Sequence, residues 1–223
     1  MGDRDVRVCV FGDSFAVGVG DPAGLGWLGR VARRKPDDVA LTTYNLGVRG
    51  DTSAHVVARF EAELALRLRV GAENKVLVSF GVNDTMLDDG APRRSTEESC
   101  AGLGALIDAT ARRALPLLVV GPTPVADDDH NARTATVSAA FAELCDRRAI
   151  PYVEVCAPLR DSVAWTSEIL RGDGAHPAEA GYQEMADLVL PAWTRLLAAP
   201  TPDRRETELW NDMSERATMG RGR

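Results

Sequence analysis

Near its N-terminus the chain reads Val6-Arg7-Val8-Cys9-Val10-Phe11, an apolar and mostly β-branched run that leads directly into Gly12-Asp13-Ser14. An apolar run bounded by turn residues is typical of a buried strand. Four further runs of this kind follow: Leu41–Leu46, Lys75–Phe80, Pro116–Gly121 and Pro151–Val155. Helical patterns alternate with these runs, over Leu25–Arg34, Ser53–Arg69, Thr96–Ala114, Asn131–Arg148 and Ala178–Leu197. This alternation predicts an α/β protein in which helices cover both faces of a parallel sheet.

The length of the chain, 223 residues, is enough for one well-buried domain and too short for two comfortable ones. The composition changes after Pro200, where the chain becomes charged and weakly periodic, with Leu209-Trp210 as its one large apolar pair. We therefore predict a single domain over residues 1–198 and a polar, mobile C-terminal tail over residues 199–223.

The net charge of the chain limits the classes of molecule that it is expected to bind. A net charge of -7 argues against binding to nucleic acid or to anionic membranes, because both rely on basic patches. The first residues lack the apolar stretch of a signal peptide, and no later run is long enough to span a bilayer. The four cysteines are scattered, without the pairing of a metal site: Cys9, Cys100, Cys145 and Cys156. We expect a soluble, cytoplasmic protein that acts on a small molecule.

Polar turns lie where the predicted strands end. Gly12-Asp13-Ser14, Asn45-Leu46-Gly47 and Gly81-Val82-Asn83-Asp84 follow the first three strands, and Asp173-Gly174-Ala175-His176-Pro177 lies in the loops after the fifth. Ligands bind at the carboxyl ends of the strands of an open parallel sheet. The fold is therefore expected to bring all four turns to one edge, with Asp84 in a structural Asx-turn.

The residues in these turns are the parts that acyl transfer needs. Ser14 becomes a nucleophile when a base removes its proton, and His176 can act as that base. Asp173, three residues earlier, can fix the imidazole tautomer and stabilise the imidazolium. The backbone N–H groups of Ser14 and Gly47 and the side-chain amide of Asn83 can donate to a developing oxyanion. Gly47 has no Cβ, which allows a close approach of the backbone to the substrate. Together these residues predict a serine hydrolase.

The four blocks, in this order, resemble those of the SGNH (GDSL-type) hydrolase family up to about residue 198. The resemblance implies a three-layer α/β/α fold with a five-stranded parallel sheet of flavodoxin-like topology. It also implies Ser14 as nucleophile, His176 as base, Asp173 as the group that orients it, and the oxyanion donors named above, with no metal or other cofactor. Phe15 replaces the usual leucine and Ala175 stands where a larger aliphatic residue is common, but neither supplies a reacting group.

The resemblance implies esterase, lipase or thioesterase chemistry, and the leading hypothesis is hydrolysis of a small carboxylic or thioester through a Ser14 acyl-enzyme. The sequence shows no long apolar lid segment, so we expect a short acyl chain. Acyl transfer, carbohydrate O-deacetylation, a non-catalytic binding module and a metal-dependent or phosphoryl hydrolase stay open as alternatives. Three predicted loops frame the substrate pocket, over residues 85–94, 122–130 and 157–172. Trp165, Leu159 and Met86 either line an acyl pocket or serve in ordinary packing.

Other patterns in the chain favour structural roles. Gly24-Leu25-Gly26-Trp27-Leu28-Gly29 matches a dinucleotide fingerprint but begins well past the strand, so we expect no NAD site there. His55, four residues after Asp51, has no apparent third ligand for a metal. Asp127-Asp128-Asp129-His130 is expected to be a solvated acidic loop at the edge of the cleft. Arg49 is equally consistent with a surface charge and with a contact to an acidic substrate.

Overall fold

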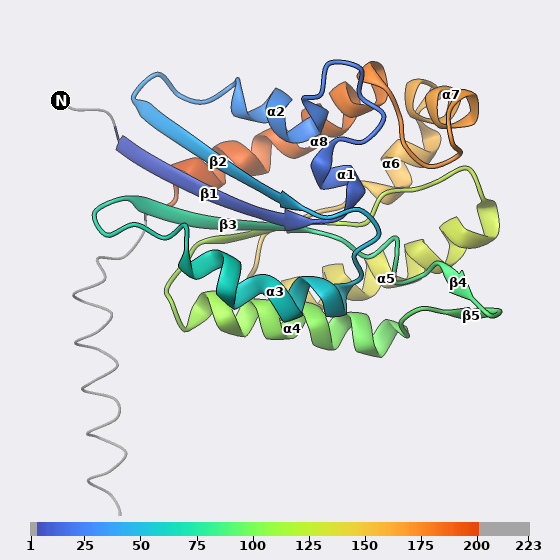
Figure 1. Ribbon diagram of the computed structural model, residues 1–223, viewed down its shortest axis with the longest axis horizontal. Coiled ribbons are helices and arrows are strands. Elements are labelled where there is room, and N and C mark those ends of the chain that lie inside the picture. The colour runs from blue at the N-terminus through green and yellow to red at the C-terminus, as the bar shows by residue number, and fades with distance from the viewer. Residues whose placement is uncertain (1–3, 201–223) are drawn as a thin grey trace, which may run out of the picture.

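The computed structural model of the protein describes residues 4–200 and contains a five-stranded parallel sheet (Figure 1). The strands are β1 (Arg4–Gly12), β2 (Val39–Gly47), β3 (Glu73–Ser79), β6 (Leu117–Val120) and β7 (Tyr152–Val153). Their spatial order, β2-β1-β3-β6-β7, places the first strand between the second and the third, as in flavodoxin-like sheets. The predicted fold class and all five predicted strands are therefore confirmed.

Helices cover both faces of the sheet and form the outer two layers (Figure 1). One layer contains α1 (Ser14–Val17), α2 (Gly26–Ala32), α6 (Cys156–Asp161), α7 (Val163–Arg171) and α8 (Glu179–Ala198). The other contains α3 (Ser53–Ala65), α4 (Thr96–Ala111) and α5 (Asp128–Arg147). Each of the five predicted helices is present, with its ends within a few residues of the predicted bounds.

The central strand β1 faces two separate apolar cores. Val6, Val8 and Val10 point into one core, whereas Cys9 and Phe11 point into the other, because successive side chains of a strand alternate between its faces. The first core contains Trp27, Trp165, Tyr182 and Trp193, and the second contains Phe60, Phe80, Leu103 and Phe141. Burial on both faces explains why the strand is apolar at every position from Val8 to Phe11.

The segment 157–172, predicted as a loop, is helical instead. It forms most of α6 and all of α7, and Ser162 between them accepts a hydrogen bond from the Trp165 N–H as the N-cap of α7. Trp165 and Ile169 are buried on the inner face of α7. Helices of six and nine residues complete too few turns to produce a clear period in the sequence, so only their packing distinguishes them from a loop.

The acidic stretch at residues 127–130 is the start of α5 rather than a loop. Asp127 is the N-cap, and its Oδ1 accepts a hydrogen bond from the His130 N–H at 2.6 Å. Acidic side chains are favoured at this end of a helix, because they balance the partial positive charge of the free N–H groups. A two-stranded hairpin, β4 (Leu87–Asp88) with β5 (Ala91–Pro92), also occupies the loop predicted over residues 85–94.

The described part of the chain ends two residues after α8. The predicted tail over 199–223 therefore lies, from residue 201 on, outside the described residues. Within residues 4–200, no helix is both long enough and apolar enough to cross a membrane.

Candidate active site

Ser14 lies at the carboxyl end of β1, where the chain turns sharply into α1. Asp13 caps this helix, because its Oδ1 accepts a hydrogen bond from the Phe15 N–H at 3.0 Å. A side chain at Gly12 would place its Cβ 2.3 Å from the Ser79 carbonyl oxygen on β3, so the turn requires glycine there. The Ser14 N–H donates to no acceptor within residues 4–200. It is therefore available to a ligand.

His176 connects Ser14 to Asp173 through two hydrogen bonds. Its Nε2 lies 2.8 Å from Ser14 Oγ, which is 162 positions away in the sequence, and its Nδ1 lies 2.7 Å from Asp173 Oδ2. The other carboxylate oxygen of Asp173 accepts from the backbone N–H groups of Ala175, at 3.0 Å, and His176, at 2.8 Å. The loop is thereby folded around the carboxylate of Asp173.

The charge state of Asp173 determines the tautomer of His176. Burial acts to raise the pKa of Asp173, but hydrogen bonds from the His176 N–H, the His176 ring and the Ala175 N–H outweigh it and hold the pKa well below the usual range. An ionised carboxylate only accepts, so the proton of the neutral imidazole resides on Nδ1. Nε2 is then free to accept the proton of the Ser14 hydroxyl, which is the geometry of a general base and its nucleophile.

Asn83 follows β3 and lines the same cavity as Ser14. Its Nδ2 donates to the Asp51 carbonyl oxygen at 3.1 Å and approaches Asp13 Oδ2 at 3.4 Å. The amide is thereby oriented from two sides, and its longer bond, to Asp13, is the weaker of the two.

Gly47, at the end of β2, packs directly against the turn that carries Ser14. A Cβ at this position would lie 2.7 Å from the Asp13 carbonyl oxygen and 2.8 Å from the Val17 backbone nitrogen. In this structure, the close approach that requires glycine is therefore to the protein's own backbone. The Gly47 N–H, predicted as an oxyanion donor, donates to Asn45 Oδ1 at 3.1 Å.

Gly50 lies in the turn that follows Gly47, and it is not among the residues that line the cavity with Ser14. It has a φ of +78°, and its N–H donates to no acceptor within the described residues. It directly precedes Asp51, whose carbonyl oxygen accepts from Asn83.

Asp13 and Asp84, on either side of the Asn83 amide in the sequence of turns, are both buried. Burial raises the pKa of Asp13 to about 7, against the hydrogen bond from the Phe15 N–H, and the neighbouring charge of Asp84 adds to the increase. Asp84 Oδ1 accepts from the Ser53 N–H at 2.7 Å and so caps α3 from another loop. The predicted Asx-turn is therefore wrong, because the Asp84 carboxylate bonds to the start of α3 and not to its own loop.

Two hollows share Asp173 and His176. The one that includes Ser14 has a volume of 280 Å³ and is lined by Ser14, Phe15, Val82, Asn83, Met86, Val125, Asp127, His130, Asp173, Gly174, Ala175 and His176. Of the three candidate acyl-pocket residues only Met86 lines it, because Trp165 and Leu159 are buried in the core. The other hollow, of 470 Å³, does not include Ser14.

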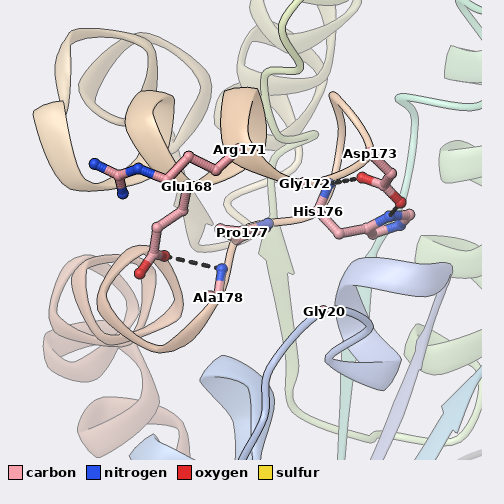
Figure 2. Close-up of a pocket in the computed structure, with 8 residues that line it drawn as sticks. All are labelled: Gly20, Glu168, Arg171, Gly172, Asp173, His176, Pro177 and Ala178. Atoms are coloured by element: carbon pink, nitrogen blue, oxygen red, sulfur yellow. Dashed lines mark hydrogen bonds and ion pairs between the residues drawn. The ribbon is translucent and has the colours of Figure 1, made fainter.

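Figure 2 shows this second hollow, with the His176 imidazole pointing towards Asp173 and away from Glu168. The Glu168 carboxylate accepts from the backbone N–H groups of Ala178, Ala180 and Gly181 at 2.8–3.1 Å. It therefore caps α8 and holds the chain that leaves His176.

The loop that matches the dinucleotide fingerprint is occupied by a side chain of the protein. The Asp21 carboxylate accepts from the N–H groups of Ala23, Leu25 and Gly26 and pairs with Arg30 at 2.5 Å. Donors of the kind that would face a pyrophosphate are thus already used by a carboxylate.

Neither His55 nor Arg49 lines the cavity that contains Ser14. His55 Nδ1 lies 3.3 Å from the Thr52 N–H and completes the N-terminal cap of α3, while Asp51 is 3.8 Å away. Arg49 is exposed. Within residues 4–200, no three His, Cys, Asp or Glu side chains are placed to hold a metal ion.

Comparison with known proteins agrees with this fold. A model of the GDSL-like Lipase/Acylhydrolase family matches residues 10–184. The chain therefore belongs to the GDSL-like lipase/acylhydrolase family, which makes it a hydrolase of ester bonds at the level of the family, and the predicted resemblance is confirmed. No curated protein matches the chain.

Three solved structures illustrate the shared fold. A lipolytic protein of the G-D-S-L family from Veillonella parvula DSM 2008 is 18% identical, with a TM-score of 0.69 over 85% of this chain and 99% of that one. The lipase/acylhydrolase from Enterococcus faecalis is 20% identical, with a TM-score of 0.68 over 86% of this chain and 96% of that one. The psychrotrophic esterase EstA from Pseudoalteromonas sp., in a structure inhibited by monoethylphosphonate, is 15% identical, with a TM-score of 0.66 over 86% and 99%.

Proposed function

We propose that this protein hydrolyses carboxylic or thioesters of small, short-acyl substrates through an acyl-enzyme formed on Ser14. The observation that carries the proposal is the hydrogen-bonded series Ser14 Oγ, His176 Nε2, His176 Nδ1 and Asp173 Oδ2, with distances of 2.8 and 2.7 Å, at the wall of a cavity.

In the acylation step, His176 Nε2 takes the hydroxyl proton as Ser14 Oγ attacks the substrate carbonyl. The imidazolium then gives the proton to the leaving alcohol or thiol, which breaks the ester bond and leaves the acyl group on Ser14. In the second step, His176 removes a proton from water, the hydroxide attacks the acyl-enzyme, and the acid product leaves as Ser14 regains its proton. Asp173 remains ionised throughout and stabilises each imidazolium.

The oxyanion of each tetrahedral intermediate needs donors that are already in place. The Ser14 N–H is free, and one Asn83 Nδ2 hydrogen can turn from its longer bond with Asp13. The predicted third donor, the Gly47 N–H, donates to Asn45 Oδ1, so it reaches the oxyanion only when that bond is released.

The size of the cavity supports a short acyl chain. Its 280 Å³ is just below the range of about 300–1,000 Å³ typical of small-molecule sites.

The test is hydrolysis of a chromogenic ester series from acetyl to palmitoyl by the wild type and by Ser14→Ala. We expect a short-chain optimum in the wild type and a loss of at least about 10³-fold in kcat in the variant. Full activity in a folded Ser14→Ala protein would overturn the assignment of the nucleophile. Folded wild type without turnover on any ester would favour deacetylation of a carbohydrate or acyl transfer, and products formed with an added alcohol acceptor would separate these two.

A phosphonate ester provides a second readout. If Ser14 is the nucleophile, its Oγ displaces nitrophenolate from a nitrophenyl phosphonate and keeps the phosphonyl group, as is consistent with the inhibited state of the Pseudoalteromonas esterase. Peptide mass spectrometry should then place the added mass on Ser14 in the wild type, and Ser14→Ala should remain unlabelled.

A further inference from the structure

The loop that carries Asn83 is held by a histidine from another element. His130, in the first turn of α5, has its Nε2 2.9 Å from the Val82 carbonyl oxygen and 3.0 Å from Thr85 Oγ1. A carbonyl oxygen can only accept, so Nε2 carries a hydrogen and donates it to Val82. Val82 directly precedes Asn83, and His130 itself lines the cavity that contains Ser14.

Other side chains of α5 hold the far end of the same loop. Thr85 Oγ1 donates to the Val82 carbonyl oxygen at 2.9 Å and lies 2.8 Å from Thr134 Oγ1. Arg133 Nε donates to the Thr85 carbonyl oxygen at 2.9 Å. The backbone on either side of Asn83 is thus attached to one helix. Among the side chains of α5, His130 bonds nearest to Asn83, at the Val82 carbonyl that Thr85 Oγ1 also reaches.

The Asn83 amide is less firmly held than the backbone on which it stands. Its two bonds, to the Asp51 carbonyl oxygen at 3.1 Å and to Asp13 Oδ2 at 3.4 Å, are longer than the His130 bond to Val82. An oxyanion would draw the amide hydrogens away from these acceptors, so during the reaction the loop backbone decides where the amide points. Misplacement of a catalytic group by about 1 Å can cost about 10²-fold in rate.

We propose that His130 is a positioning residue for the oxyanion: through its bond to the Val82 carbonyl it keeps the Asn83 amide in place beside Ser14. This inference rests on the proposed function, in which Asn83 stabilises the oxyanion. Its effect falls on the transition state, in which the oxyanion exists, rather than on the bound ester.

The test compares three substitutions of His130 on the best ester of the series. In His130→Gln, the side-chain nitrogen is as many bonds from Cβ as Nε2 of histidine, so a donor is retained. His130→Leu removes the donor. His130→Asn keeps a donor, but one bond too close to Cβ to reach the Val82 carbonyl. We expect Leu and Asn to lower kcat by about 10–100-fold with KM changed less than about 3-fold, and Gln to restore kcat to within about 3-fold of wild type. If the Leu variant does not fold, the Gln and Asn variants decide the question.

A double-mutant cycle with Asn83→Ala shows whether His130 acts through Asn83. Asn83→Ala alone should cost about 10²–10³-fold in kcat, and adding His130→Leu to it should cost less than about 3-fold more. Multiplicative losses in the double variant, or wild-type kcat in folded His130→Leu or His130→Asn, would overturn the proposal. Thr136→Ala, which changes an exposed side chain further along α5, serves as the control and should leave kcat unchanged.

These outcomes are distinct from a failure of the proposed function. If Ser14→Ala retains full activity, the mechanism itself is wrong. If Ser14→Ala is inactive while the losses from His130 and Asn83 multiply, the mechanism stands and only the role of His130 is refuted.

Discussion

Asp13 directly precedes the proposed nucleophile, and its carboxyl group is buried. Its Oδ1 caps α1 and its Oδ2 faces the Asn83 amide, with Asp84 also buried nearby. Burial raises its pKa to about 7, and the charge of Asp84 acts in the same direction. Around neutral pH, ionisation of this group therefore opposes folding.

We expect the contribution of Asp13 to the stability of the wild-type protein to fall as the pH rises from about 4 to 7. An aspartate titrates near 4 in an unfolded chain, whereas Asp13 titrates near 7 in the folded one, so the folded state binds more protons across this window. Asp13→Asn keeps an acceptor for the Phe15 N–H and removes the titration. The melting temperature of Asp13→Asn minus that of wild type should therefore be larger at pH 8 than at pH 4.5, by at least about 2–4 °C. A change of about 1 kcal/mol in the free energy of unfolding shifts the melting temperature by this amount in a protein of this size.

Calorimetry of both proteins at the two pH values measures this change. A difference in melting temperature that is the same at pH 4.5 and pH 8 would mean that Asp13 titrates alike in the folded and unfolded states.

At the scale of elements, the junction between α7 and α8 determines where His176 lies. The N-cap of α8 is Ala178, which has no side-chain acceptor, and Glu168 of α7 accepts the free N–H groups of α8 instead (Figure 2). The helical period predicts α8 from the sequence. It does not predict that α7 exists or that one of its side chains caps the next helix, because that bond joins residues whose proximity follows from packing.

Glu168→Ala should lower the free energy of unfolding by about 1–2 kcal/mol, as for the loss of a helix cap, and should also lower kcat because the chain around His176 loosens. Urea unfolding and ester hydrolysis measure the two effects. Glu179→Ala, which removes an exposed carboxylate from the first turn of α8, is the matched control and should retain wild-type kcat. Equal stability of the two variants would contradict the capping role.

At the scale of the whole molecule, the parallel sheet brings together turns that are far apart in the chain. In the β1–β2 register, Gly12 lies opposite Gly47, and this contact sets the end of β2 against the turn that carries Ser14. A Cβ at Gly47 would meet backbone atoms of Asp13 and Val17, which cannot move away as a flexible side chain would.

Gly47→Ala should therefore destabilise the protein by about 1–3 kcal/mol, the usual cost of overpacking, and should lower kcat by displacing Ser14. Gly104→Ala is the matched control, because Gly104 lies within α4 and a Cβ there meets nothing within 4 Å. That variant should be more stable than wild type by roughly 0.5–1 kcal/mol, since alanine favours a helix. Thermal unfolding of the two variants tests whether the first is less stable and the second more stable than wild type. A stable, fully active Gly47→Ala protein would refute the argument.

The sequence by itself determined the five strands, the main helices and the order of the four blocks that mark the family, because these depend on local periodicity and on residue types in order. It also identified Ser14, Asp173 and His176, which the fold brings within hydrogen-bond distance of one another. Only the tertiary structure decided that α7 is a helix, that the Gly47 N–H is taken by Asn45 while that of Gly50 is free, and that His130 holds the Asn83 loop. The physical reason is that hydrogen bonds and close packing between distant segments have no period and no fixed spacing along the chain.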